Sequence, residues 1–141
     1  MAKKKVIVIG GGFGGLNVVQ GLKKADCEIL LIDKTNHHLF QPLLYQVATA
    51  GLSPANIAFP LREILRKQKN ATVIMAEVTS IDVEKKHVHV HDGAIYPYDI
   101  LVVATGAHHS YFGHPEWEGN APGLKTLLEA LTIRDELLLV Y

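Results

Sequence analysis

The feature that most constrains the fold is a run of glycines that interrupts an apolar segment near the N-terminus. Residues 10–15 read GGGFGG, so five of six consecutive positions carry no side chain. The run lies between two short apolar segments, Val6–Ile9 and Glu28–Ile32, which are typical of strands buried in a parallel sheet. Between them, apolar residues recur at helical spacing: Leu16, Val19 and Leu22. The segment therefore predicts a βαβ unit of about 30 residues, with the glycines at its first turn.

The glycine spacing and a following acid match the fingerprint of dinucleotide binding. Gly10, Gly12 and Gly15 have the GxGxxG spacing where the first strand gives way to the helix. Gly10 would permit the tight turn, Gly12 the approach of a pyrophosphate, and Gly15 the close packing of the helix on the sheet. Asp33, at the end of the second strand, is expected to bond ribose hydroxyls and to disfavour a 2′-phosphate. The alternative is a turn that only packs tightly, and the fingerprint does not choose between NAD and FAD.

The middle of the chain predicts a small antiparallel insertion. A third strand is expected over Thr72–Val78, and the segments Ile81–Val83 and His87–His91 then alternate strictly between apolar and polar residues. Turn-forming residues separate them, so we expect a β-meander over about 79–97 with one wet face. Another doubly buried strand is expected over Asp99–Ala104. The predicted fold class is α/β, with a Rossmann-like parallel sheet and the meander inserted in it.

Two further helices are expected. Ser53 followed by Pro54 is typical of a helix start. Pro60 could instead delay the true start of the helix. An apolar stripe supports this helix: Ile57, Leu61, Ile64 and Leu65. The last helix is expected from Leu124 onward, with a second stripe that we interpret as core: Leu127, Leu128 and Leu131.

Composition excludes several classes of function. The formal net charge is zero, so no nucleic-acid partner is expected. No apolar stretch is long enough to span a bilayer, and a cytoplasmic location is predicted. Cys27 is the single cysteine, which argues against disulfide reductases and sulfide:quinone reductases and favours a packed thiol. The alternating histidines of the predicted meander could in principle bind a metal, but we interpret them as a solvated face and predict no metal site.

Two long segments resemble one family of flavoproteins. They read NHHLFQPLLYQVATAGLSPANIAFPLREIL at residues 36–65 and YDILVVATGAHHSYFGHPEWEGNAPGLKTL at residues 98–127. Both resemble bacterial type II NADH dehydrogenases, the NADH:quinone oxidoreductases of the pyridine nucleotide-disulfide oxidoreductase superfamily. These are single-chain enzymes that pass electrons from NADH through FAD to a membrane quinone. The resemblance extends over almost the whole chain.

The resemblance implies a set of FAD contacts. The pyrophosphate would lie against the glycine turn, at Gly10, Gly12, Phe13, Gly14 and Gly15. Asp33 would hold the adenosine ribose with Lys34 beside it, and the backbone near Val78, at the end of the third strand, would meet the adenine. The isoalloxazine would lie near Gln41 and Pro42. The phosphate and ribityl side of the flavin would pass close to Ala104, Thr105 and Gly106. No catalytic side chain is implied, because the flavin itself carries the hydride.

The adjacent histidine pairs have less specific expected roles. We interpret His37 and His38 as loop residues near the flavin, and His108 and His109 as surface residues. Tyr45 would either stack near the flavin or fill the core.

The resemblance also implies a domain organisation. Residues 1–123 would form an incomplete FAD-binding domain, and residues 124–141 would start a helix leading to an NADH domain that this sequence does not contain. We therefore expect an N-terminal fragment of a two-dinucleotide-domain flavoprotein. The full-length family implies NADH and quinone as partners and a peripheral location on the cytoplasmic face of the inner membrane. The apolar end of the last helix suggests a homodimer.

Two other classes of function stay open at this point. The chain could be a non-catalytic module that holds a dinucleotide, or nothing, and turns over no substrate. It could also be an NAD-binding dehydrogenase domain that uses the same fingerprint, although the meander and the ATG segment at residues 104–106 argue against it.

Overall fold

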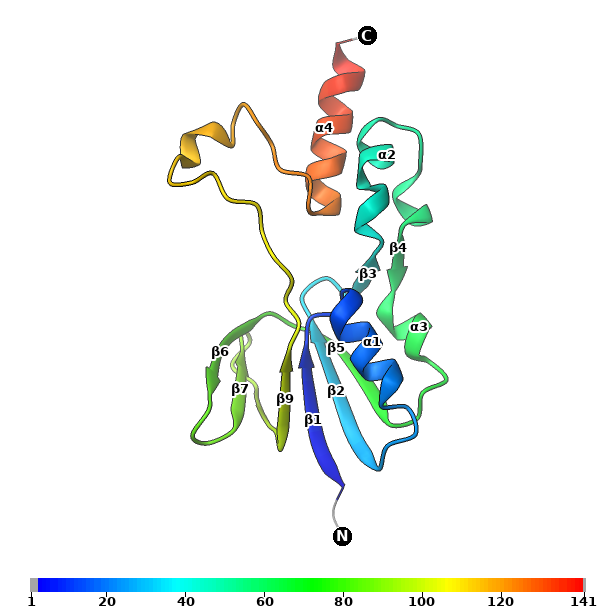
Figure 1. Cartoon of the computed structure of the whole chain (residues 1–141), viewed down its shortest axis with the longest axis vertical. Coiled ribbons are helices and arrows are strands. Elements are labelled where there is room, and N and C mark those ends of the chain that lie inside the picture. Colours follow the sequence, from blue (N-terminus) through cyan, green and yellow to red (C-terminus); the bar gives the residue numbers. More distant parts are fainter. Residues whose placement is uncertain (1–2, 141) are drawn as a thin grey trace. The chain divides into compact units, whose positions relative to one another are not determined.

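The computed structural model describes residues 3–140, which divide into two compact units (Figure 1). The first unit contains the described residues up to His38 together with Pro60–Gly106. The second unit contains Leu39–Phe59 and the chain from Ala107 onward. Each unit is therefore built from two stretches that are far apart in the sequence.

A four-stranded parallel sheet is the centre of the first unit. Strand β1 (Lys4–Ile9) lies between β2 (Cys27–Asp33) and β9 (Ile100–Val103), and β5 (Ala71–Met75) pairs with the other edge of β2. The order β5-β2-β1-β9 places the first strand of the chain inside the sheet, and Figure 1 shows these strands side by side. The predicted α/β class, with its parallel sheet and an antiparallel meander, is confirmed.

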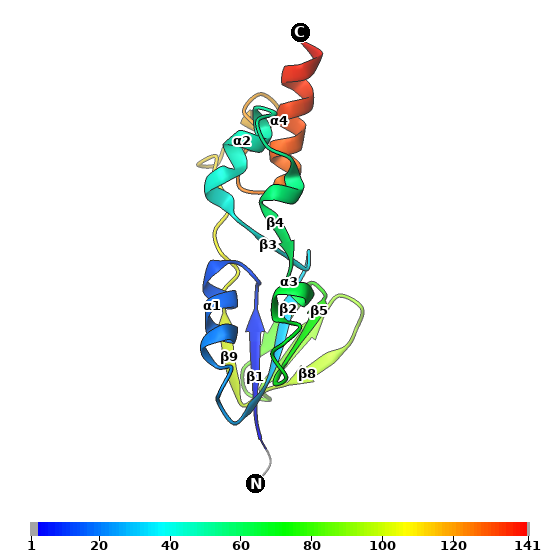
Figure 2. The same ribbon diagram turned by 90° about the vertical axis from the view of Figure 1, so that its right-hand side faces the viewer.

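Each face of this sheet has its own hydrophobic core. On one face, alternate residues of β1 and β2 pack against α1 (Phe13–Gly21) and α3 (Leu61–Leu65). The buried residues of this core include Val6, Val8, Leu16, Val19, Ile29, Leu31, Leu61 and Leu65. On the other face, Ile7, Ile9 and Ile32 pack against Val88 and Val90 of the meander. Figure 2 shows α1 and the meander on opposite sides of the sheet. Covering both faces explains why the central parts of these strands, Val6–Ile9 of β1 and Ile29–Ile32 of β2, are apolar without interruption.

The meander consists of β6 (Val78–Asp82), β7 (His87–Val90) and β8 (Ile95–Pro97) in antiparallel order. Side-chain oxygens fix both turns: Asp82 Oδ1 accepts the Lys85 N–H at 2.9 Å, and Asp92 Oδ1 accepts the Ala94 N–H at 2.9 Å. The valines of β7 point into the core, and the histidines alternate with them. Within residues 3–140, no group of three or more His, Cys, Asp or Glu side chains could hold a metal ion.

Two expectations about strands are wrong. The third strand ends at Met75, and Val78 is the first residue of β6, where it pairs with Val90. The reason is that the chain leaves the parallel sheet at Ala76 to enter the meander. Strand β9 is not doubly buried, since Ile100 and Val103 are 52% and 59% exposed. It lies at the edge of the parallel sheet, where one side of the strand has no neighbour among the described strands.

The helix expected from Ser53 is divided by Pro60. Pro54–Asn56 forms only a single 3-10 turn, η2, and Ala58–Pro60 forms β4, which pairs with β3 (His37–Leu39). The helix α3 begins at Leu61, directly after the proline. A proline disfavours helical backbone at the residue before it and lacks an N–H, so a helix can start after it but not run through it. The predicted apolar stripe is accordingly split, because Ile57 packs in a different core from Leu61.

The second unit packs two helices together, α2 (Leu44–Ala48) and α4 (Leu127–Leu139), with the 3-10 turns η1 (Gln41–Leu43) and η3 (Pro115–Trp117). Its buried core consists of Leu44, Val47, Ala48, Ile57 and Ala130. The last helix begins three residues later than Leu124, after the N-cap residue Thr126. Leu128 is 75% exposed, so only Leu127 and Leu131 of the predicted stripe contact this core. None of the helices described over residues 3–140 has the length and apolar character needed to cross a membrane.

Candidate dinucleotide-binding site

Two of the fingerprint glycines are required by close backbone packing. Gly10 has φ +96°, a conformation that side chains disfavour, and a Cβ at this position would collide with the carbonyl of Ala104. A Cβ at Gly15 would collide with the carbonyl of Gly10. The Gly10 N–H donates to the Ile32 carbonyl at 2.8 Å, and the Ala104 N–H donates to the Ile9 carbonyl at 2.8 Å. The turn thus brings the ends of three strands and the start of α1 into contact.

Gly12 differs from these two glycines because nothing packs against it. It is the N-cap of α1, it is exposed, and a Cβ there would meet no atom within 4 Å. No side chain caps this helix, and its first turn carries no acid. The first N–H groups of a helix lack intrahelical partners and carry the positive end of the helix dipole. Gly12, Phe13 and Gly14 are all exposed, so the start of α1 is a surface suited to an anionic group such as a pyrophosphate.

The carboxylate of Asp33 ties the glycine turn to the loop after β2. Its Oδ2 accepts the Gly11 N–H at 2.7 Å. Its Oδ1 accepts hydrogen bonds from the Thr35 N–H, the Thr35 hydroxyl and the Asn36 N–H at 2.8, 2.9 and 2.8 Å. A carboxylate oxygen offers two lone pairs, so Oδ2 keeps capacity for a ligand hydroxyl. Lys34, next in the chain, is exposed.

His38 belongs to the same cluster, which the sequence alone did not reveal. Its Nδ1–H donates to the Gly11 carbonyl at 3.1 Å, and its ring meets the Phe13 ring edge-on with the centroids 5.0 Å apart. His37 Nδ1–H donates instead to the Thr35 carbonyl, at 2.6 Å. Both histidines lie on β3 rather than in a loop, because their segment pairs with β4. The only sequence signal for His38 was its place within residues 36–65.

The segment after β9 lies against the glycine turn through Ala104, and Thr105 and Gly106 are exposed. Of the predicted site residues, the first unit gathers the glycines, Phe13, Asp33 and this segment in one place. Val78 lies in β6, where its side chain packs at the margin of the meander core. It is therefore not at the strand end that we expected.

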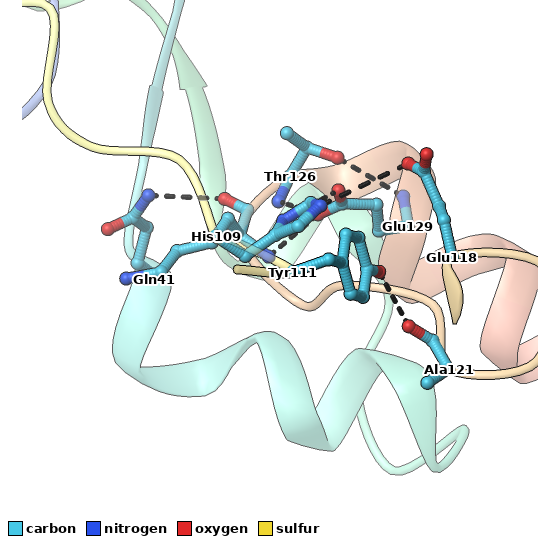
Figure 3. Close-up of polar contacts among 8 residues, drawn as sticks. Gln41, His109, Tyr111, Glu118, Ala121, Thr126 and Glu129 are labelled. Carbon is cyan, nitrogen blue, oxygen red and sulfur yellow. Dashed lines mark hydrogen bonds and ion pairs between the residues drawn. The ribbon is translucent and has the colours of Figure 1, made fainter. Parts of the chain in front are cut away.

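Gln41 and Pro42 belong to the second unit, where both are exposed in η1. The Gln41 Nε2 donates to the Lys125 carbonyl at 3.1 Å, which joins η1 to the residues before α4 (Figure 3). Tyr45 is 54% exposed, so it does not fill the core.

A second polar cluster surrounds His109 in this unit (Figure 3). The prediction of a surface residue is wrong, since His109 is half-buried and its Nδ1 is buried without a hydrogen bond. This Nδ1 lies 3.5 Å from Glu129 Oε1, and Nε2 lies 4.0 Å from Glu118 Oε1. Tyr111 packs edge-on against the ring and donates its O–H to the Ala121 carbonyl at 2.6 Å. Gly123 permits the arrangement, because a Cβ there would collide with the His109 ring.

Glu129 connects this cluster to the start of α4. Its Oε2 accepts the N–H groups of Lys125 and Thr126 at 2.7 and 2.8 Å, and Thr126 Oγ1 accepts the Glu129 N–H at 3.2 Å. Burial raises the pKa of the Glu129 carboxyl, but these hydrogen bonds and the nearby His109 outweigh it and hold the pKa below 4.5. An ionised carboxylate in the first turn also suits the positive end of the helix dipole.

Comparison with known proteins identifies relatives of this architecture. The chain is 50% identical over 139 residues to the type II NADH:quinone oxidoreductase NdhA of Mycobacterium tuberculosis, covering 96% of this chain and 30% of the relative. It is 35% identical over 132 residues to a type II NADH:quinone oxidoreductase of Staphylococcus aureus, covering 91% of this chain and 32% of the relative. The resemblance indicated by the sequence is confirmed. The chain spans about a third of the length of these relatives.

Solved structures show the same fold over nearly the whole chain. NDH2 from Plasmodium falciparum, in complex with NADH, has a TM-score of 0.89 at 26% identity and covers 99% of this chain and 30% of that one. The sulfide:quinone oxidoreductase of Aquifex aeolicus has a TM-score of 0.89 at 32% identity, covering 98% of this chain and 32% of that one. The family profile described as pyridine nucleotide-disulphide oxidoreductase matches residues 4–139, and this family is FAD-dependent, as expected. The chain belongs to the pyridine nucleotide-disulphide oxidoreductase family.

Proposed function

We propose that this chain is the FAD-binding N-terminal part of an NADH:quinone oxidoreductase. The observation that carries the proposal is the contrast within the fingerprint: Gly10 and Gly15 are required by backbone packing, whereas Gly12 faces open space. A glycine that no neighbour requires, at the start of a helix, leaves room for a ligand phosphate. Membership of the FAD-dependent pyridine nucleotide-disulphide oxidoreductase family supports FAD rather than NAD as that ligand.

Each part of the cofactor has proposed contacts. The exposed backbone of Gly12, Phe13 and Gly14 would hold the pyrophosphate, with Gly10 and Gly15 shaping the turn beneath it. Asp33 Oδ2 would accept a ribose hydroxyl, beside Lys34. The adenine would meet the backbone near Val78, and the phosphate and ribityl side would pass Ala104, Thr105 and Gly106. Gln41 and Pro42 would lie near the isoalloxazine.

The residues of this chain would bind and orient the cofactor rather than react. When bound, FAD supplies the acceptor for a hydride from NADH and the donor of electrons to a quinone. The glycine turn would fix the pyrophosphate by hydrogen bonds from backbone N–H groups, which need no change of protonation. Asp33, already held by Gly11, Thr35 and Asn36, would act as a pre-oriented acceptor. A rigid acceptor loses little conformational entropy on binding.

The proposal includes the organisation of the longer protein. Residues 1–123 would contribute to the FAD-binding domain, and residues 124–141, which include α4, would lead toward an NADH-binding part. NADH and a quinone would be its substrates, and the whole enzyme would lie on the cytoplasmic face of the membrane as a peripheral protein. The chain covers only 30% and 32% of the two relatives, which supports its being part of a longer protein.

Self-association of the chain is also proposed, through the C-terminal end of α4. Leu138, Leu139 and Val140 are 55%, 86% and 82% exposed, so Leu139 is the most exposed of the three. Exposed apolar residues in a row favour association in water. Light scattering after size-exclusion chromatography should give the mass of a dimer for the unmodified chain. The Leu139→Asp variant should give the mass of a monomer. A monomer of the unmodified chain would contradict this part.

The test of cofactor choice is a calorimetric titration of the purified chain with FAD, NAD and NADP, each in a separate experiment. We expect FAD to bind most tightly and Gly12→Ala to weaken FAD binding at least about tenfold, because its Cβ occupies the approach of the phosphate. Gly21→Ala is the matched control, since Gly21 also faces open space but lies at the other end of α1. Tighter binding of NAD than of FAD would overturn the choice in favour of a dehydrogenase domain.

Turnover separates an active fragment from a binding module. NADH oxidation with a soluble quinone, measured on the FAD-saturated chain, would reveal flavin-dependent activity in this fragment. Its absence, with FAD bound, would assign the chain a binding role and leave the chemistry to the longer protein.

A further inference from the structure

His38 makes contacts that the proposed cofactor site does not use. Its side chain is half-buried, its Nδ1 bonds to the Gly11 carbonyl and its ring rests against Phe13. Both partners belong to the glycine turn, although His38 lies on β3, after the second strand. The neighbouring His37 makes neither contact and bonds to Thr35 instead.

The bond to Gly11 fixes the direction of the next amide. The carbonyl of Gly11 and the N–H of Gly12 belong to the same planar peptide unit and point in opposite directions in its trans form. A donor that holds this carbonyl therefore aims the Gly12 N–H away from His38. On the other side of the residue, the Gly11 N–H is held by Asp33 Oδ2 at 2.7 Å. Gly11 is thus fixed at both of its peptide groups by side chains.

We propose that His38 is a positioning residue for the phosphate-binding backbone: by holding the Gly11 carbonyl, it orients the Gly12 N–H toward a dinucleotide pyrophosphate. The inference rests on the proposed function, since the pyrophosphate is the ligand whose affinity would depend on that N–H. Glycines are the most flexible residues of a chain, and five of six positions here are glycine. An external side chain is a direct way to keep such a turn in one conformation before the ligand arrives.

The test compares His38→Leu with His38→Asn. Asparagine places an amide N–H close to the position of Nδ1, whereas leucine fills space without donating. We expect His38→Leu to weaken FAD binding roughly tenfold, as the loss of one positioned hydrogen bond would. His38→Asn should restore the affinity to within about threefold of the original protein. His37→Leu is the matched control and should bind FAD as the unmodified chain does.

A second readout needs no cofactor. Amide hydrogen exchange and the ¹H–¹⁵N shift of Gly12, measured in the ligand-free protein, should change in His38→Leu and return in His38→Asn. An unmodified chain that fails to bind FAD would refute the proposed function, while the Gly12 amide would still report whether His38 holds the turn. Equal FAD affinity in His38→Leu and the unmodified chain, or an unchanged Gly12 amide, would overturn the role of His38. Weak binding by both His38 variants would also overturn it, because a fold-level effect would then explain the loss.

Discussion

A glycine packs tightly in each unit of the molecule, but against different kinds of neighbour. In the first unit, the place of a Cβ at Gly15 is taken by the backbone carbonyl of Gly10. In the second unit, the place of a Cβ at Gly123 is taken by the side chains of His109 and Glu129. A backbone carbonyl inside a sheet-to-helix turn cannot move aside, whereas a side chain can adopt another rotamer. The glycine turn should therefore be rigid and intolerant of change, and the His109 cluster adaptable.

The largest loss of unfolding free energy is expected for Gly15→Ala. Its Cβ would force the first turn of α1 away from β1, and overpacking of this kind costs about 3 kcal/mol of unfolding free energy. Gly12→Ala should cost no more than about 1 kcal/mol, because its Cβ enters open space and only the N-cap preference changes. Urea unfolding of both variants measures the difference. Equal losses of stability would show that the two glycines do not have distinct roles.

Glu129→Ala should have the next largest effect. It removes the acceptor for the N–H groups of Lys125 and Thr126, just before α4. Of the capping interaction, only the hydrogen bond from the backbone N–H of residue 129 to Thr126 Oγ1 would remain. Loss of a helix cap costs about 1–2 kcal/mol. Glu136→Ala, on the exposed final turns of the same helix, is the control and should leave the unfolding free energy nearly unchanged. A smaller loss for Glu129→Ala than for this control would contradict the capping role.

The stability of the protein should depend on pH in the acidic range because of the Glu129 carboxylate. Folding lowers the pKa of Glu129, so its contribution to stability is complete above the unfolded value of 4.5 and is lost as the pH falls through the lower, folded value. Stability measured from pH 6 downward should fall in this acidic window, and Glu129→Gln should flatten that part of the profile. A profile of Glu129→Gln that is parallel to that of the unmodified chain would assign the acid sensitivity to other groups.

The smallest effect is expected for Gly123→Ala. The new Cβ would displace the His109 ring, which can move toward solvent, and the cost should be about 1 kcal/mol or less. Gly119→Ala is the control in the same segment, since a Cβ there meets nothing within 4 Å. A loss as large as that of Gly15→Ala would mean that the His109 cluster is as rigid as the glycine turn.

The sequence predicted the parts of the molecule in which local pattern and backbone geometry agree. The βαβ unit and the meander were predictable because strand alternation, glycine spacing and turn residues each act over a few neighbouring positions. The stripe from Ile57 to Leu65 was misleading, since its spacing is helical but Pro60 divides it between two cores. Periodicity reports which residues are buried, not which core buries them.

Contacts between side chains distant in sequence were not predictable. His38 and Gly11 lie 27 positions apart, and their contact forms only when the chain after β2 folds back to the glycine turn. His109 reaches Glu129 from a segment without regular structure, so no period or motif marked it as half-buried. Val78 was assigned to the wrong strand because it closely follows the β-forming run Thr72–Met75, whereas the chain leaves that strand at Ala76 and begins β6 at Val78.

The most direct test of the central claim is a ¹H–¹⁵N spectrum of the labelled chain during titration with FAD. The claim is that the exposed backbone at Gly12 receives the pyrophosphate while Asp33 receives the ribose. The largest shifts should then occur at Gly12, Gly14, Gly15 and the residues next to Asp33, and Gly12→Ala should reduce them. Saturation by FAD without shifts at the glycine turn, or shifts confined to residues of the second unit, would contradict the claim.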